Sequence, residues 1–233
     1  MRRLFVLVGK VYLARNVLRG KFVFLMSCVI IIANILNMNN LHRIFIAISL
    51  PEKLRNLLAG LQDKWLELPA KWARPESLHI TLNFLGNTND QEMCDICALA
   101  MEVARRHDPF DLKFERVCYG PLKDLPAGGA PRMIWALGEK SDELGSLQRD
   151  LENTLHEFAG ADSESGAGYS FSPHITLARI NQAALKQLET EEIPAVDEPV
   201  NRTFMVESIE VMESETKRGG PVYTVLESIK LGE

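Results

Sequence analysis

The pattern of apolar and polar positions after residue 42 switches between two periods. Short runs of strand length alternate with longer runs that carry apolar residues at helical spacing. In 51–68, Pro51 occupies a first-turn position and leucines recur every three or four residues, which predicts an amphipathic helix. The first half of the pattern predicts a strand over 43–50, a helix over 51–68, a strand containing His79, a helix over 90–106 and a strand over 110–120.

The second half of the chain repeats this order. Ser141 is placed to cap a helix over 141–160, because its side chain can accept a hydrogen bond from the backbone of the first turn. The other expected elements are a strand over 132–139, a strand containing His174, a short helix over 181–192 and two final strands over 202–213 and 221–231. The repetition predicts an α+β protein built by internal duplication of two lobes.

The tetrapeptide His-Ile-Thr-Leu occurs twice, beginning at His79 and at His174, in a chain with five histidines. Residues two apart in a strand share a face, so each histidine points to the same side as its threonine, Thr81 or Thr176. The aliphatic residues of each copy point to the other side, which suits a core. Either copy alone would fit ordinary packing, since Thr is a good strand former. The matched repetition favours a shared function.

Two imidazoles that face one cleft form a general acid–base pair, and a pseudo-twofold relation between the lobes would bring both copies together. A neutral ring can accept a proton from water while a charged ring donates a proton to a leaving oxygen. The hydroxyls of Thr81 and Thr176 can donate hydrogen bonds to oxygens that gain charge in the transition state. A phosphodiester has the matching arrangement of one entering, one leaving and two anionic oxygens. The scheme requires no metal.

The paired motifs resemble those of the two-histidine phosphoesterase superfamily. The stretches RIFIAISLPEKLRNLL, LHITLNFLG and SPHITLARI together resemble its RNA 2′,3′-cyclic phosphodiesterase branch (LigT-like, 2′-5′ RNA ligase family). The resemblance implies a bilobal α+β fold, with two antiparallel-sheet lobes and outer helices around a central cleft. It also implies metal-independent hydrolysis of a 2′,3′-cyclic phosphate at an RNA end to a 2′-phosphomonoester. By this resemblance His79 is the proton donor, His174 is the proton acceptor, and Thr81 and Thr176 hold the phosphate.

Two arginines near the motifs are candidates for contacts with an RNA backbone. Arg132 precedes a predicted strand and Arg179 follows His174 by five residues. Regular alternation turns Arg179 away from the histidine face, and it would reach the phosphate if the strand ended near Ala178. Each arginine also fits an ordinary solvated charge. By the same alternation, Phe84 is predicted to belong to the core.

Composition narrows the classes of function. The chain has 233 residues, 46% of them hydrophobic and 24% charged, which is typical of a globular protein with a full-sized core. Its net charge of -5 argues against a wide basic face that coats nucleic acid, but it leaves room for a few arginines in a cleft. Cys94 and Cys97 lie in a predicted helix without a second cysteine pair or a nearby histidine, so we expect neither a metal site nor a cofactor.

The first forty residues depart from this pattern. Residues 21–36 are strongly apolar and follow several basic residues, as in a signal peptide or an inward-facing membrane anchor. The run is shorter than the roughly 20 apolar residues of a spanning helix. The alternative is a natural start at Met38, which makes 1–37 an extension outside the fold and 38–233 the two-lobed domain. This alternative favours a cytoplasmic protein, with membrane contact only if the extension is present.

Three functions fit these residues. The first is an RNA 2′,3′-cyclic phosphodiesterase acting on RNA ends such as tRNA halves, able also to run the reverse 2′-5′ ligation, without a stable protein partner. The second is a cyclic phosphodiesterase for a small nucleotide. The third is a non-catalytic module that binds RNA ends, against which the intact histidines and threonines count.

Overall fold

The computed structural model describes residues 41–121, 130–158, 171–189 and 192–233. The chain divides into two compact units, 1–40 and 41–233, and every described residue belongs to the second. The expectations about residues 1–37 therefore lie outside the described residues. Within those residues, no helix combines the length and the apolar character that a membrane crossing requires.

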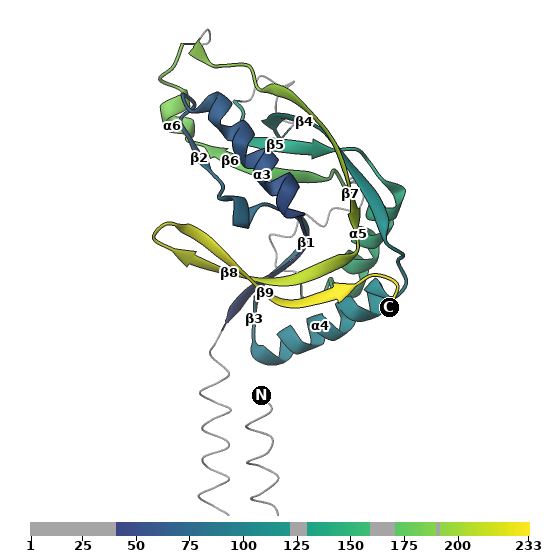
Figure 1. The fold of residues 1–233 in the computed structure, drawn as a ribbon. Helices are drawn as coiled ribbons and strands as arrows, with labels where there is room; N and C mark the ends of the chain where they lie inside the picture. The colour runs from purple at the N-terminus through teal and green to yellow at the C-terminus, as the bar shows by residue number, and fades with distance from the viewer. Residues whose placement is uncertain (1–40, 122–129, 159–170, 190–191) are drawn as a thin grey trace, which may run out of the picture. The chain divides into compact units, whose positions relative to one another are not determined.

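Most elements follow the predicted order (Figure 1), but the single strand expected over 202–213 divides at Glu207 into two strands, Asp197–Val206 and Ser208–Lys217. The helices are α3 (Glu52–Leu61), α4 (Asp90–Ala104), α5 (Asp142–Leu155) and α6 (Gln182–Leu185), with short 3₁₀ helices η1 (Gln62–Trp65) and η2 (Pro75–Ser77). The strands are β1 (His42–Ser49), β2 (Ala70–Trp72), β3 (His79–Thr88), β4 (Phe110–Gly120), β5 (Met133–Gly138), β6 (His174–Ile180), β7 (Asp197–Val206), β8 (Ser208–Lys217) and β9 (Gly220–Lys230).

Local signals account for the elements that agree with the sequence. Ser141 caps α5 as predicted, since its Oγ accepts a hydrogen bond from the Leu144 backbone N–H at 3.1 Å. The predicted helix over 51–68 ends earlier, at Leu61, and continues as η1. Strand β2 was not predicted, because three residues are too few to show an alternating pattern.

The described strands form one antiparallel sheet, which confirms the α+β class. Its order is β7-β4-β5-β6-β3-β1-β8-β9, with β2 paired to β6 beside this path. The sheet has two halves, β7-β4-β5-β6 and β3-β1-β8-β9, and the pairing of β3 with β6 is limited to Ile80 opposite Ile175. The predicted lobes are thus half-sheets that meet at the centres of the two repeated motifs.

Chain segments of one half cross to the other. The segment after α3 leaves the β3 half and supplies β2 to β6. There the Trp65 indole N–H donates to the Ala195 carbonyl at 3.1 Å, and Lys64 pairs with Glu198 of β7. In the opposite direction, α5 packs against α4 and β3 (Figure 1). The exchange ties the half-sheets together on both sides of their short contact.

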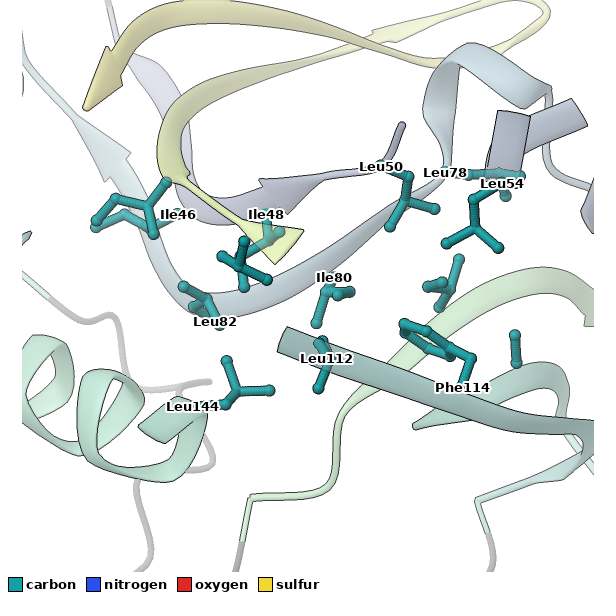
Figure 2. Close-up of a cluster of buried hydrophobic side chains, with 14 of the residues drawn as sticks. Ile46, Ile48, Leu50, Leu54, Leu78, Ile80, Leu82, Leu112, Phe114 and Leu144 are labelled. Atoms are coloured by element: carbon teal, nitrogen blue, oxygen red, sulfur yellow. The ribbon is translucent and has the colours of Figure 1, made fainter. Parts of the chain in front are cut away.

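The larger of two buried hydrophobic clusters in the described residues runs beneath both half-sheets. Ile80 and Ile175, which join the halves, are fully buried in it, as is Phe114 of β4. Burial of such side chains is the main stabilising contribution to the fold. Figure 2 shows part of this core, drawn from strands and helices of both halves: Ile46, Ile48, Leu50, Leu54, Leu78, Ile80, Leu82, Leu112, Phe114 and Leu144.

Candidate active site

The structure brings the two repeated motifs side by side in neighbouring antiparallel strands. Ile80 lies opposite Ile175 in the antiparallel pair, and both are fully buried. Because side chains alternate, the residues on either side of each isoleucine point to the other face. That face carries the four polar residues of the two motifs, all half-buried: His79, Thr81, His174 and Thr176. A pseudo-twofold axis between the two isoleucines relates one His-Thr pair to the other.

Both imidazoles are held in the same orientation by the backbone. Nδ1 of His79 lies 2.8 Å from the Ser77 carbonyl oxygen, and Nδ1 of His174 lies 2.9 Å from that of Ser172. A carbonyl oxygen only accepts, so each Nδ1 carries a hydrogen and donates it. Nε2 is therefore the ring atom of each histidine that can accept or donate a proton in a reaction. In each motif the serine two residues before the histidine makes this contact through its backbone carbonyl, and its side chain takes no part in it.

Thr81 is coupled directly to its histidine. Its Oγ1 lies 3.0 Å from Nε2 of His79. With His79 neutral, the hydroxyl donates to Nε2; with His79 charged, Nε2–H donates to the hydroxyl oxygen. The direction of this hydrogen bond therefore depends on the protonation state of the ring.

Aromatic side chains that sequence reasoning missed surround both histidines. The ring centroids of Phe45 and Tyr223 each lie 5.0 Å from that of His79. The indole of Trp135 stacks on His174 with a centroid separation of 4.0 Å and an interplanar angle of 28°. In the sequence these aromatic residues are indistinguishable from core positions, because they lie in alternating strands whose partners are distant in the chain.

Burial sets the protonation of the pair. It lowers the pKa of His79 below the ordinary histidine value; the hydrogen bond to the Ser77 carbonyl partly offsets this, and the charge of His174 lowers the pKa further. Burial likewise lowers the pKa of His174, and the hydrogen bond that its Nδ1–H donates to the Ser172 carbonyl partly offsets this. Each ring therefore resists carrying a charge, and a bound anion would favour the charged form of both.

Each motif contains a β-bulge at its leucine. On β3, Ala47 lies opposite Thr81 and the next partner, Ile46, lies opposite Asn83, so Leu82 is passed over. On β6, the partners Trp135 and Ile134 lie opposite Thr176 and Ala178, so Leu177 is passed over. An extra residue of this kind shifts the alternation of every side chain that follows it in the strand.

The bulges overturn the expectation that Phe84 belongs to the core. Phe84 lies opposite Phe45, on the histidine face, and the two rings are 6.0 Å apart. Its side chain is 57% exposed. Phe84 and Arg179 each lie five residues after a motif histidine. Both are therefore turned to the histidine face.

Arg179 reaches the histidine face by the bulge rather than by an early end of β6. It lies opposite Met133, which shares a face of β5 with Trp135. Burial raises the pKa of Tyr223, and the positive charges of Arg179 and Arg43 partly offset this rise. Arg132 is exposed just before β5; its backbone N–H donates to the Gly120 carbonyl, and its carbonyl accepts from Ile180.

The remaining described histidines have structural partners. His42 lies between Glu213 and Asp90, at 2.7 and 3.0 Å, and His107 contacts Asp150 at 2.9 Å. His156 is exposed at the end of α5. In the part of the chain that the structure describes, no group of three or more His, Cys, Asp and Glu side chains has an arrangement that could hold a metal ion.

The comparisons with known proteins agree with this geometry. A sequence model of the family described as LigT like Phosphoesterase matches residues 44–130. An RNA 2′,3′-cyclic phosphodiesterase of Thermus thermophilus is 33% identical over 197 residues, which are 81% of this chain and 90% of that protein. One of Methanothermobacter thermautotrophicus is 26% identical over 191 residues, or 81% and 98% of the two chains.

Solved structures show the same fold. The crystal structure of the Thermus thermophilus protein TT0787 has a TM-score of 0.67 at 31% identity, covering 82% of this chain and 98% of that one. The E. coli LigT structure complexed with 3′-AMP has a TM-score of 0.65 at 21% identity, covering 83% and 100%, a likeness that concerns the fold. With a third of the aligned residues identical over 90% of the Thermus thermophilus relative, this chain belongs to the LigT-like phosphoesterase family.

Proposed function

We propose that this protein hydrolyses 2′,3′-cyclic phosphodiester ends of RNA to 2′-phosphomonoesters. The observation that carries the proposal is the pair of imidazoles on one face. Each Nδ1 donates to a backbone carbonyl, so Nε2 is the atom that can transfer a proton, and on His79 the substrate takes the place of its contact with Thr81. The names of the curated relatives support the choice of substrate.

In the proposed step His174 is the base and His79 is the acid. Nε2 of His174 accepts a proton from water as the water oxygen bonds to phosphorus. The bond from phosphorus to the 3′ oxygen breaks, and Nε2–H of His79 gives its proton to that oxygen. The 2′ ester bond remains, so the product is a 2′-phosphomonoester. Two imidazoles supply both proton transfers, and the step is balanced without a metal.

The hydroxyls of Thr81 and Thr176 hold the non-bridging oxygens of the reacting phosphate, and Arg179 contacts the RNA on the same face. Donors of this kind stabilise charge that grows in the transition state. Arg132, at the exposed start of β5, contacts the RNA backbone. The exposed ring of Phe84 offers a surface on which the terminal base can stack, as aromatic residues do in single-stranded RNA recognition.

The cysteines support a reducing compartment. Cys94, Cys97 and Cys118 are free thiols in the described structure, as is usual for cytosolic proteins. We place the reaction in the cytoplasm, on RNA ends such as tRNA halves. With the 5′ hydroxyl of a second RNA end in place of water as the nucleophile, the same two histidines can catalyse 2′-5′ ligation: the new bond joins that oxygen to phosphorus, and the 3′ oxygen leaves with a proton from His79.

The test is hydrolysis of an RNA oligomer that ends in a 2′,3′-cyclic phosphate, with EDTA present. We expect turnover, with the product identified by phosphorus NMR as the 2′-phosphate. An untouched RNA end would overturn the proposal, and turnover of nucleoside 2′,3′-cyclic phosphates alone would redirect it to small nucleotides. Tight binding of the RNA end without turnover would identify a binding module.

The pH dependence follows from the direction of the two pKa shifts. Activity falls as pH rises through the pKa of the acid and as pH falls through the pKa of the base. Since burial lowers the pKa of both histidines, the bell-shaped profile of kcat/KM is expected to be centred below about 6.5, the ordinary histidine value. The profile of kcat should be centred at higher pH, because the bound phosphate raises both values.

Stopped assays from pH 4.5 to 9 would measure both profiles, with thermal unfolding followed at each pH to confirm that the protein stays folded. The two limbs of the bell-shaped profile report apparent pKa values of the coupled pair of histidines rather than of single residues. A kcat/KM profile centred above pH 7.5 would contradict the burial argument.

A further inference from the structure

Two cations lie directly opposite each other where β2 pairs with β6. Lys71 is the partner of Arg179 in the register of these strands, so both side chains point to the same face. Like charges in this position destabilise a sheet. Among residues 41–121, 130–158, 171–189 and 192–233, no carboxylate makes an ion pair with either side chain. The pair is therefore a stability cost that a bound anion would relieve.

A hollow of about 490 Å³ opens beside this pair. It is lined by Lys71, Arg179 and Asn181 together with four apolar residues, and its lining contains no carboxylate. The two cations and the Asn181 side-chain NH2, whose amide oxygen caps α6, are suited to the phosphate and sugar of a nucleotide.

The turn of the β8–β9 hairpin closes one side of the same region. Arg74 donates a hydrogen bond to the Pro221 carbonyl at 3.2 Å, which joins the hairpin to the segment after β2 (Figure 1). The Lys71 ammonium lies over Gly220, where an added Cβ would be 3.1 Å from Nζ and where φ is +120°. Further along β9, Tyr223 contacts His79 and is influenced by the charge of Arg179. The cationic pair is thus continuous with the histidine face.

We propose that Lys71, paired with Arg179, binds the backbone phosphate that links the last two nucleotides of the RNA. This inference rests on the proposed function and extends it to a preference for a chain over a mononucleotide. Arg179 is three residues beyond Thr176, at most about 10 Å along the strand. Long cationic side chains therefore reach a phosphate one nucleotide away from the reacting one.

The experiment compares two substrates, a nucleoside 2′,3′-cyclic phosphate and a dinucleotide that ends in the same cyclic phosphate. In the full chain, Lys71→Gln is expected to lower kcat/KM for the dinucleotide about tenfold, as for the loss of one charge-assisted hydrogen bond, and to change it less than about twofold for the mononucleotide. Log kcat/KM for the dinucleotide should also depend less steeply on log salt, by about 0.7, since one phosphate contact of a single strand is lost.

Two further variants sharpen the test. Lys71→Arg keeps the positive charge and should retain the wild-type preference for the dinucleotide. Lys230→Gln removes a lysine at the opposite end of β9 from the hairpin turn and should behave as wild type. An equal effect of Lys71→Gln on both substrates, or an unchanged salt slope, would overturn the proposed site for the backbone phosphate. The proposed function would not be affected by that result. If the wild-type protein hydrolyses neither substrate, the proposed function fails and this inference fails with it.

Discussion

Replacing either His79 or His174 with alanine is expected to lower kcat for a cyclic-phosphate RNA end by about 10²-fold or more. Each variant loses one of the two proton transfers, while the rest of the face that holds the phosphate remains. Both rings are half-buried on a face opposite the core, so the fold should survive their loss. Single-turnover assays with saturating enzyme, together with thermal unfolding, would separate loss of chemistry from loss of structure.

The matched control is His156→Ala, which removes an exposed histidine whose Nδ1 lies near the Asn153 carbonyl at the end of α5. It should keep wild-type activity. The double variant of His79 and His174 should be little slower than the worse single variant, because groups that act as a unit are not additive. If both single variants retain the kcat of the wild-type protein, the repeated tetrapeptide is a packing feature and the acid–base assignment is wrong.

The second large effect is expected from a glycine. A Cβ at Gly120 would lie 2.4 Å from Cδ2 of Trp135 and less than 3 Å from two further atoms of the indole. That ring stacks on His174 at 4.0 Å, so it must shift and move the imidazole with it. Misplacing a catalytic group by about 1 Å can cost 10²-fold in rate. We therefore expect Gly120→Ala to lower kcat by about 10- to 10²-fold, with a smaller change in KM.

Gly60→Ala is the control for this glycine, because a Cβ there meets nothing within 4 Å and alanine favours the helix α3. It should leave activity unchanged and the melting temperature unchanged or higher. Adding Trp135→Phe to Gly120→Ala shrinks the obstructing ring and should recover part of the lost rate. Full activity of Gly120→Ala would show that the indole does not position His174.

The sequence alone was sufficient for the features that depend on local order. Period-two alternation places each motif histidine with its threonine on one face and the aliphatic residues on the other, and burial of Ile80 and Ile175 agrees with it. The helix signals succeed for the same reason, as the cap at Ser141 shows. These are properties of neighbouring residues, and a single chain segment carries them in full.

Local order did not determine which strands meet. The contact at Ile80 and Ile175 joins segments almost a hundred residues apart, and it alone brings the two imidazoles to one face. The three residues of β2 form a strand because β6 offers them a partner. Trp135 becomes a neighbour of His174 only through the pairing of β5 with β6.

The two bulges mark the limit of alternation as a guide. Regular alternation turns Phe84 toward the core and Arg179 away from the histidines. Both directions are reversed because one extra residue, Leu82 or Leu177, precedes that position in the strand. A bulge is fixed by the register between two strands, which the sequence of either strand does not contain. The sequence by itself thus determined which residues can do the chemistry, whereas the pairing of distant strands decided which of them share a face.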